Sequence, residues 1–146
     1  MSDAVIDTTV VALSNVRLTC LKEGSNLHAR IRLLKQCYAG ERRIRFNGRL
    51  RAEYDSKVSG IENDFVRLFF ELLDSSRSIF VKKSTLSRQF YDRARNDCGW
   101  PGHDQHILAA GVGGEQVVLF VTEERHCNCR AAIKRVFDFN LVRMRK

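Results

Sequence analysis

Polar and apolar residues alternate along two segments in the first part of the chain. Segment 16–22 reads VRLTCLK and segment 27–35 reads LHARIRLLK, and apolar side chains recur at every second position over much of both. A period of two places apolar side chains on one face of an extended chain and polar side chains on the other. The letters KEGSN between them are typical of a turn. We therefore predict two strands joined as a hairpin, preceded by an opening strand.

The spacing changes to a helical period from about residue 58. Between residues 61 and 75, apolar residues recur every three or four positions, which predicts a helix. A second helix is predicted at 84–98, where an apolar stripe is followed by the helix-ending letters GWP. Residues 106–122 are predicted to form two strands around the turn GVGGEQ, and a last short helix begins near Asn128.

Segment 42–54, RRIRFNGRLRAEY, has five arginines, and four of them recur at every second position on the two sides of an Asn-Gly pair. A two-residue turn would mix apolar and charged side chains on both faces. A three-residue loop ending at Gly48 instead pairs Ile44 with Leu50 and gives Gly48 the left-handed position that this loop requires. Burial of one face specifies register, so we predict the second arrangement. Its polar face holds Arg43, Arg45, Arg49 and Arg51.

Together these elements predict an α+β fold in a single domain covering residues 1–146. Residues 1–57 form a basic antiparallel meander, and residues 58–146 form two helices, a β-hairpin and a further helix. This order is similar to the later part of a winged-helix domain, in which helix 84–98 would enter the major groove of DNA. The order is also common in other α+β domains, so an ordinary surface helix at 84–98 stays open as the alternative.

Charge narrows the class of partner. The chain has 25 basic and 17 acidic residues, a formal net charge of +8, and 18 of the basic residues are arginine. Arginine binds phosphate bidentately and stacks on bases, which favours nucleic acid as the partner. We predict a non-catalytic nucleic-acid-binding protein that contacts mainly phosphates, with RNA favoured over DNA. The residues expected to make these contacts are Arg17, Arg30, Arg32, Arg43, Arg45, Arg49, Arg51, Arg88 and Arg95.

The arginines can also have roles that involve no nucleic acid. Acidic side chains from the second half, such as Glu62 or Glu71, can cover them, or the charges can serve only to prevent edge pairing. The competing function is a structural or assembly subunit, such as a virus-encoded one, whose arginines meet an acidic protein or another copy of the chain. No apolar run is long enough to cross a bilayer, so we expect no membrane partner.

Cysteine and histidine residues are concentrated between positions 98 and 129. The spacing C-x4-H-x2-H followed by H-C-x-C could supply the four ligands of a structural zinc site. Cys98 also lies on the apolar stripe of its predicted helix, where it can be an ordinary core residue, and the C-x2-C spacing of common zinc modules is missing. The candidate zinc ligands are Cys98, His103, Cys127 and Cys129.

Catalytic motifs are not apparent in the sequence. We find no paired carboxylates, and the glycines of GVGGE are not followed by the Lys-Ser/Thr of a phosphate loop. Five cysteines without regular spacing predict reduced thiols. The opening letters MSDAVIDTTVVAL carry acid where a secretion signal carries base. We therefore expect an intracellular protein without enzymatic activity.

Overall fold

The structure, a computed structural model, describes residues 2–146. It is built on a five-stranded sheet in the order β3-β2-β1-β4-β5, in which every neighbouring pair is parallel. The strands are β1 (Ser2–Ile6), β2 (Arg42–Phe46), β3 (Ile79–Phe80), β4 (Val118–Val121) and β5 (Asn140–Arg143). Helical segments connect each strand to the next, as parallel pairing requires.

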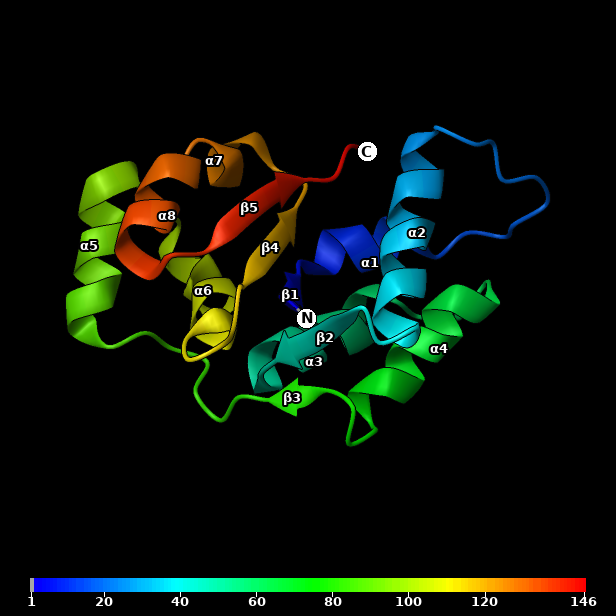
Figure 1. Ribbon diagram of the computed structural model, residues 1–146, viewed down its shortest axis with the longest axis horizontal. Coiled ribbons are helices and arrows are strands. Elements are labelled where there is room, and N and C mark those ends of the chain that lie inside the picture. The colour runs from blue at the N-terminus through cyan, green and yellow to red at the C-terminus, as the bar shows by residue number, and fades with distance from the viewer. Residues whose placement is uncertain (1) are drawn as a thin grey trace.

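The connecting helices are α1 (Thr8–Ser14), α2 (Asn26–Tyr38), α3 (Gly48–Lys57), α4 (Asp64–Leu73), α5 (Arg88–Cys98), the 3-10 helix η1 (Gly102–Asp104), α6 (Gln105–Gly111), α7 (Glu124–Cys127) and α8 (Arg130–Phe137). Figure 1 shows α2 and α4 on one side of the sheet and α5, α6 and α8 on the other. Among residues 2–146, no helix combines the length and the apolar content needed to span a bilayer.

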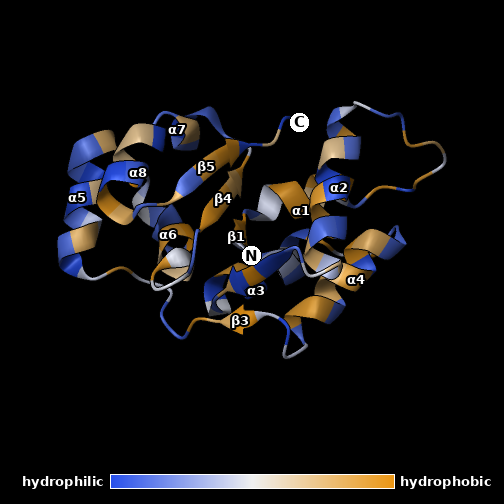
Figure 2. Cartoon of the chain, viewed as in Figure 1, coloured by the Kyte–Doolittle hydropathy of each residue, from blue (hydrophilic) through white to orange (hydrophobic). Residues whose placement is uncertain are grey.

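The predicted antiparallel meander and the α+β class are wrong, because the sheet is wholly parallel and the protein is an α/β structure. The central strands β1 and β4 are buried on both faces, with Val5, Ile6, Leu119 and Val121 fully inaccessible. Strands of this kind read as apolar runs rather than as alternating patterns. Figure 2 shows the resulting contrast between the hydrophobic strand β4 and the mixed colours of the surrounding helices.

Segment 27–35 lies in helix α2 and not in a strand. The buried side chains of α2 include Ile31, Leu34 and Cys37, which follow helical spacing. The Ser25 hydroxyl caps the helix by accepting the His28 N–H at 3.1 Å. Ile31 is the one β-branched residue in the segment, so its composition favours helix over strand. Segment 16–22 is an irregular loop, and the predicted hairpin does not form.

Segment 42–54 divides into strand β2 and the beginning of helix α3, so its predicted hairpin is also wrong. Asn47 is the N-cap of α3, and its side chain accepts the Leu50 N–H at 3.1 Å. Gly48 is the first helical residue and does not have a positive φ. Ile44 and Leu50 are buried, but one lies in the strand and the other in the helix. An Asn-Gly pair suits an N-cap as well as a hairpin turn.

In the second half, the helices predicted at 61–75 and 84–98 are confirmed as α4 and α5, and Gly99 ends α5 in the left-handed conformation. The predicted hairpin around GVGGEQ is wrong, because residues 105–111 form helix α6 before strand β4 begins. The glycines form a helix-to-strand turn rather than a wing. Helix α8 begins close to the predicted position, and the basic tail contains strand β5.

A buried ion pair fixes the amino end of β1. Asp3 accepts a hydrogen bond from Arg43 at 3.0 Å, and its second carboxylate oxygen lies 3.6 Å from Arg45. Arg45 also donates to the carbonyls of Ala110 and Val112, each at 2.8 Å. These bonds hold the C-terminal end of α6 at the amino edge of the sheet. The N-terminal end of α6 therefore lies toward the carboxyl edge.

Candidate active site

Strands β1 and β4 are neighbours in the sheet, but the chain continues from them in opposite directions. It runs from β1 to β2 on one side and from β4 to β5 on the other. In open α/β sheets, ligands bind outside the carboxyl ends of the strands at such a switch point. Asp7 follows β1 there, and its N–H donates to the Phe120 carbonyl of β4 at 2.9 Å. Thr122 and Glu123 follow β4. Both strands therefore deliver polar side chains to the same place.

Asp104, Glu123 and His126 form a compact group beside Asp7. One potential ligand atom from each of the three lies within 4.8 Å of the others. His126 is buried, and its Nε2 lies 2.8 Å from an Asp104 carboxylate oxygen. Arg125 lies 3.3 Å from the same oxygen and also pairs with Glu123. Two carboxylates and one imidazole are a donor set suited to a divalent cation.

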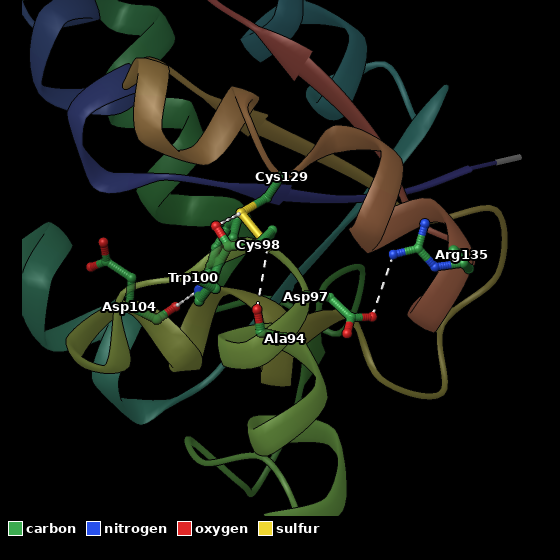
Figure 3. Close-up of a disulfide and its surroundings, with 7 residues drawn as sticks. All are labelled: Ala94, Asp97, Cys98, Trp100, Asp104, Cys129 and Arg135. Carbon is green, nitrogen blue, oxygen red and sulfur yellow. Dashed lines mark hydrogen bonds and ion pairs between the residues drawn. A yellow bond between two sulfur atoms is a disulfide. The ribbon is translucent and has the colours of Figure 1, made fainter.

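The segment between α5 and α6 holds Asp104 in place. The Asp104 N–H donates to the Pro101 carbonyl at 3.0 Å, and the Asp104 carbonyl accepts the indole N–H of Trp100 at 3.0 Å (Figure 3). Trp100 is 3% exposed, and its ring stacks on that of His126 with the centroids 4.6 Å apart. One buried indole therefore orients both Asp104 and His126.

A further acidic side chain, Glu53 of α3, contacts Thr8 and His106, which are close to Asp7 and Asp104 in the chain. Glu53 accepts a hydrogen bond from the Thr8 hydroxyl at 3.0 Å, and its other carboxylate oxygen lies 3.1 Å from Nε2 of His106. Asn47 ties the two helices together, because it caps α3 and donates to the His106 carbonyl at 2.9 Å. We call the assembled residues the carboxyl-edge cluster: Asp7, Glu53, Asp104, His106, Glu123 and His126.

Burial raises the pKa of Asp7 from 3.8 to about 6, with His126 opposing the change and the charges of Asp104 and Glu123 adding to it. Burial would also raise the pKa of Asp104, but the hydrogen bond and charge of His126, together with other nearby cations, bring that pKa below its usual value. Burial lowers the pKa of His106, although Glu53 favours its charged form. The surroundings of Asp7 therefore favour the uptake of a proton or a cation.

Several buried polar atoms at the cluster lack a protein partner. Within the part of the chain that the structure describes, His106 Nε2, His126 Nδ1 and Thr122 Oγ1 are buried and make no hydrogen bond. His106 Nε2 points at Glu53, but their contact falls outside hydrogen-bond geometry. A buried polar group left unpaired costs about 1–3 kcal/mol. Such groups, set beside the buried carboxylate of Asp7, indicate a place built to receive a ligand.

Basic residues lie at the same edge of the sheet as the cluster. In a parallel sheet, the residues that follow β3 and β5 lie at the same edge as those that follow β1 and β4. Two lysines follow β3, an arginine follows β5, and two further arginines lie on α3 and α7 next to the cluster acids. All five are exposed. We call them the basic rim: Arg49, Lys82, Lys83, Arg125 and Arg145.

The nine arginines predicted to contact phosphate are dispersed over the fold. Arg30 and Arg45 are buried, and Arg43 and Arg51 are held in ion pairs with acidic side chains. Arg49 belongs to the basic rim. Contact between nucleic acid and the exposed remainder stays a prediction. These residues lie on α2, on α5 and in the loop before α2: Arg17, Arg32, Arg88 and Arg95.

The four predicted zinc ligands differ in bonding and in exposure. Cys98 and Cys129 form a disulfide whose Cα atoms are 5.2 Å apart, which departs from the expectation of reduced thiols. Cys127 is free and partly buried, and His103 is exposed with Nε2 3.7 Å from Asp104. A disulfide sulfur carries no thiolate, and zinc requires thiolate ligands. A zinc site at these residues therefore stays a prediction for the reduced protein.

Sequence reasoning missed the carboxyl-edge cluster, although two signals for it exist. Asp7 directly follows the apolar run AVI, and Glu123 comes one residue after VVLFV. An acid placed just after a short apolar run suggests the carboxyl end of a buried parallel strand. Glu53 and Asp104 have no comparable signal, because they reach the cluster from a helix and from a connecting segment.

Comparisons of the chain with family models, with curated proteins and with solved structures found no match. Function is therefore inferred from the geometry and chemistry of the cluster and its rim.

Proposed function

We propose that this protein is a divalent-metal-dependent nuclease, which hydrolyses phosphodiester bonds in nucleic acid. One observation carries the proposal: ligand atoms of Asp104, Glu123 and His126 meet within 4.8 Å at the switch point of the sheet. The buried Asp7 lies beside them with a raised pKa. Among the described residues Asp7 has no ion-pair partner, and a buried charge of this kind is costly to the fold unless a proton or a cation neutralises it.

The donor set fits Mg²⁺ or Mn²⁺, which are bound by a few carboxylates together with substrate phosphates; Mn²⁺ also accepts the imidazole of His126. When bound, such an ion lowers the pKa of a coordinated water and stabilises charge on a phosphoryl oxygen. Glu53 is suited to take the proton of an attacking water. Its carboxylate is fixed by the Thr8 hydroxyl at 3.0 Å and lies 3.1 Å from His106.

The basic rim supports a nucleic acid as the substrate. Arg49 and Arg125 pair with acids of the cluster, whereas Lys82, Lys83 and Arg145 make no ion pair among the described residues. A phosphate chain held by these three cations lies at the same edge of the sheet as the carboxylates. Contacts of this kind are made to the backbone and carry little sequence information. The net charge of +8 favours the same class of substrate over a small neutral one.

Non-catalytic binding of nucleic acid, the function predicted from composition, stays the alternative. Of the nine arginines predicted to make its contacts only Arg49 belongs to the basic rim, and this function assigns no chemistry to the carboxylates. An assembly role gives a third outcome, in which nucleic acid is not bound at all. The three functions differ in whether metal is required and whether the strand is cut.

The proposal predicts cleavage that requires both the metal and Asp104. End-labelled RNA, single-stranded DNA and duplex DNA are incubated with the protein in Mn²⁺, Mg²⁺ or EDTA. We expect cleavage with metal only. Asp104→Asn should reduce the rate by more than about 100-fold, because partners that merely orient a metal ligand already account for about 10- to 100-fold in affinity or activity.

The matched control is Asp97→Asn, since Asp97 forms a surface pair with Arg135 at 3.4 Å. This variant should cleave like the wild type. Equal cleavage by Asp104→Asn and wild-type protein would identify a contaminating nuclease and contradict the proposal. Salt-dependent binding in EDTA without cleavage under any metal condition would favour the non-catalytic function instead.

A further inference from the structure

The disulfide joins the two segments that carry the metal-binding residues. Cys98 is the last residue of α5, and Cys129 is the N-cap of α8. The bond spans a sequence separation of 31 residues, and the loop that it closes contains Asp104, Glu123 and His126. Figure 3 shows the bond with Trp100 and Asp104 beside it.

A short chain of contacts runs from the disulfide to the metal-binding residues. Trp100 follows Cys98 by two positions, stacks on His126 and donates its indole N–H to the Asp104 carbonyl. On the other side, the Cys129 N–H donates to the His126 carbonyl at 3.0 Å. Each sulfur is therefore close along the chain to a residue that positions a metal-binding side chain.

The packing of α5 against α8 does not depend on the disulfide alone. The rings of Phe90 and Phe137 contact each other with centroids 5.5 Å apart, and Asp97 pairs with Arg135 at 3.4 Å. Neither contact involves a sulfur atom, so we expect both to remain when the sulfur–sulfur bond opens. Reduction should therefore loosen the segments around Asp104 and His126 without separating the two helices.

We propose that the Cys98–Cys129 bond is a redox switch that sets the affinity of the carboxyl-edge cluster for its metal. This inference rests on the proposed function. In the oxidised protein the bond fixes the loops that carry Asp104 and His126. In the reduced protein those loops gain freedom and the metal is held less tightly.

The switching reaction is thiol–disulfide exchange. Cys129 is fully buried and Cys98 is partly exposed, so we expect a small thiolate to attack the Cys98 sulfur. A bond forms between that thiolate and Cys98, and Cys129 leaves as a thiolate that takes up a proton. A second thiolate then attacks the mixed disulfide and releases Cys98 as a thiol. The protein disulfide gains two electrons and two protons and becomes two thiols. The two thiols of the reductant become one disulfide.

The test uses the whole 146-residue chain carrying Cys20→Ser and Cys127→Ser, which leaves the disulfide pair and the buried Cys37. One sample stays oxidised, and the other is reduced with dithiothreitol that is then removed without oxygen. Mn²⁺ affinity is measured from the free-ion electron paramagnetic resonance signal. We expect the dissociation constant to rise about tenfold on reduction, the lower end of the effect of groups that orient metal ligands.

Two further samples sharpen the result. Cys98→Ser/Cys129→Ser should bind Mn²⁺ like the reduced protein and should not respond to dithiothreitol. Trp100→Phe keeps a ring against His126 but loses the indole bond to Asp104, so its oxidised form should bind Mn²⁺ more weakly than the parent. Buffers with mostly reduced glutathione should open the bond, as shown by thiol alkylation and mass spectrometry.

The outcomes separate the two proposals. Equal Mn²⁺ affinity in both redox states overturns the switch and leaves the nuclease proposal intact. Loss of far-ultraviolet circular dichroism on reduction, or a bond that stays closed in reduced glutathione, makes the disulfide a purely structural crosslink and also overturns the switch. No Mn²⁺ binding by the oxidised protein overturns the proposed function and the switch with it.

Discussion

At the residue scale, two buried aspartates at opposite ends of β1 have opposite surroundings. Asp3 is 1% exposed and contacts Arg43, Arg45 and the Glu115 N–H. Asp7 is 7% exposed and is surrounded by other members of the carboxyl-edge cluster. The first carboxylate is neutralised by the protein itself. The second needs an ion or a proton, so the two residues should respond in opposite directions to the same substitution.

We predict that Asp7→Asn stabilises the metal-free protein at neutral pH and abolishes Mn²⁺ binding. The folded-state pKa of about 6 lies above the usual 3.8, so the stabilising contribution of Asp7 is complete below pH 3.8 and is lost as the pH rises through 6. An asparagine does not incur this loss, which amounts to about 2–3 kcal/mol. Urea denaturation should show the gain at pH 7.5 and little effect at pH 3.5.

Asp3→Asn is the matched control for this prediction. It leaves the buried Arg45 without a full counter-charge, so it should destabilise the protein by about 3 kcal/mol. Its effect on Mn²⁺ affinity should be small in protein that remains folded. If Asp7→Asn destabilises the protein as much as Asp3→Asn does, Asp7 is a structural residue and the cluster is not built around a cation.

At the scale of elements, strong local signals were enough for some segments and not for others. Helix α4 could be predicted because its apolar residues recur every three or four positions, a spacing that does not fit a strand. Strand β4 could be predicted because its apolar run is short and continuous. The letters of α2 fit both periods, and the Asn-Gly pair at 47–48 fits both a hairpin and a cap. Parallel pairing decides between these possibilities, and it depends on strands far apart in the sequence. The cluster could not be predicted for the same reason, because its members come from five separate segments.

The element-scale prediction concerns the cap of α3. Asn47 accepts the Leu50 N–H and donates to the carbonyls of His106 and Lys83. Asn47→Ala removes all three bonds and should cost about 3 kcal/mol, at about 1 kcal/mol each. Because Glu53 and His106 are then no longer held together, the rate of RNA cleavage should also fall. Thermal denaturation and the cleavage assay measure the two effects.

Ser25→Ala provides the comparison, since Ser25 caps α2 with one bond to the His28 N–H. It should cost about 1 kcal/mol and leave cleavage unchanged. Should Asn47→Ala and Ser25→Ala have equal effects on both stability and cleavage, Asn47 is an ordinary helix cap with no influence on the cluster.

At the scale of the whole molecule, the protein places an acidic cluster inside a basic rim. The carboxylates alone repel a phosphate chain, and the rim alone attracts one without orienting it. A bound cation reverses the charge at the centre, so the metal and the rim should act together on nucleic acid. The net charge of +8 is compatible with this arrangement. What links charge to chemistry is the location of the basic rim at the carboxyl edge, where the cluster lies.

We therefore predict metal-dependent binding of nucleic acid with a salt dependence set by the rim. Glu53→Gln protein keeps Asp104, Glu123 and His126 but loses the proposed proton acceptor, so binding can be measured without cleavage. Mn²⁺ should tighten its binding of single-stranded RNA at least about tenfold over EDTA, or about 1.4 kcal/mol. Adding Lys82→Gln and Lys83→Gln should flatten the salt slope by about 1.4, since each phosphate contact on a single strand contributes about 0.7.

Lys134→Gln/Arg135→Gln on α8 removes the same charge from a different part of the surface. Both residues are exposed and lie in the last turn of α8, which packs along β5. Because the chain leaves α8 to enter β5, this turn lies near the amino edge of the sheet, away from the rim. If removal of these two charges flattens the salt slope as much as removal of Lys82 and Lys83, binding follows the total charge and not the basic rim. A slope that changes only with the rim lysines, together with affinity that depends on Mn²⁺, requires the phosphate chain to cross the carboxyl edge, where the cluster can act on it.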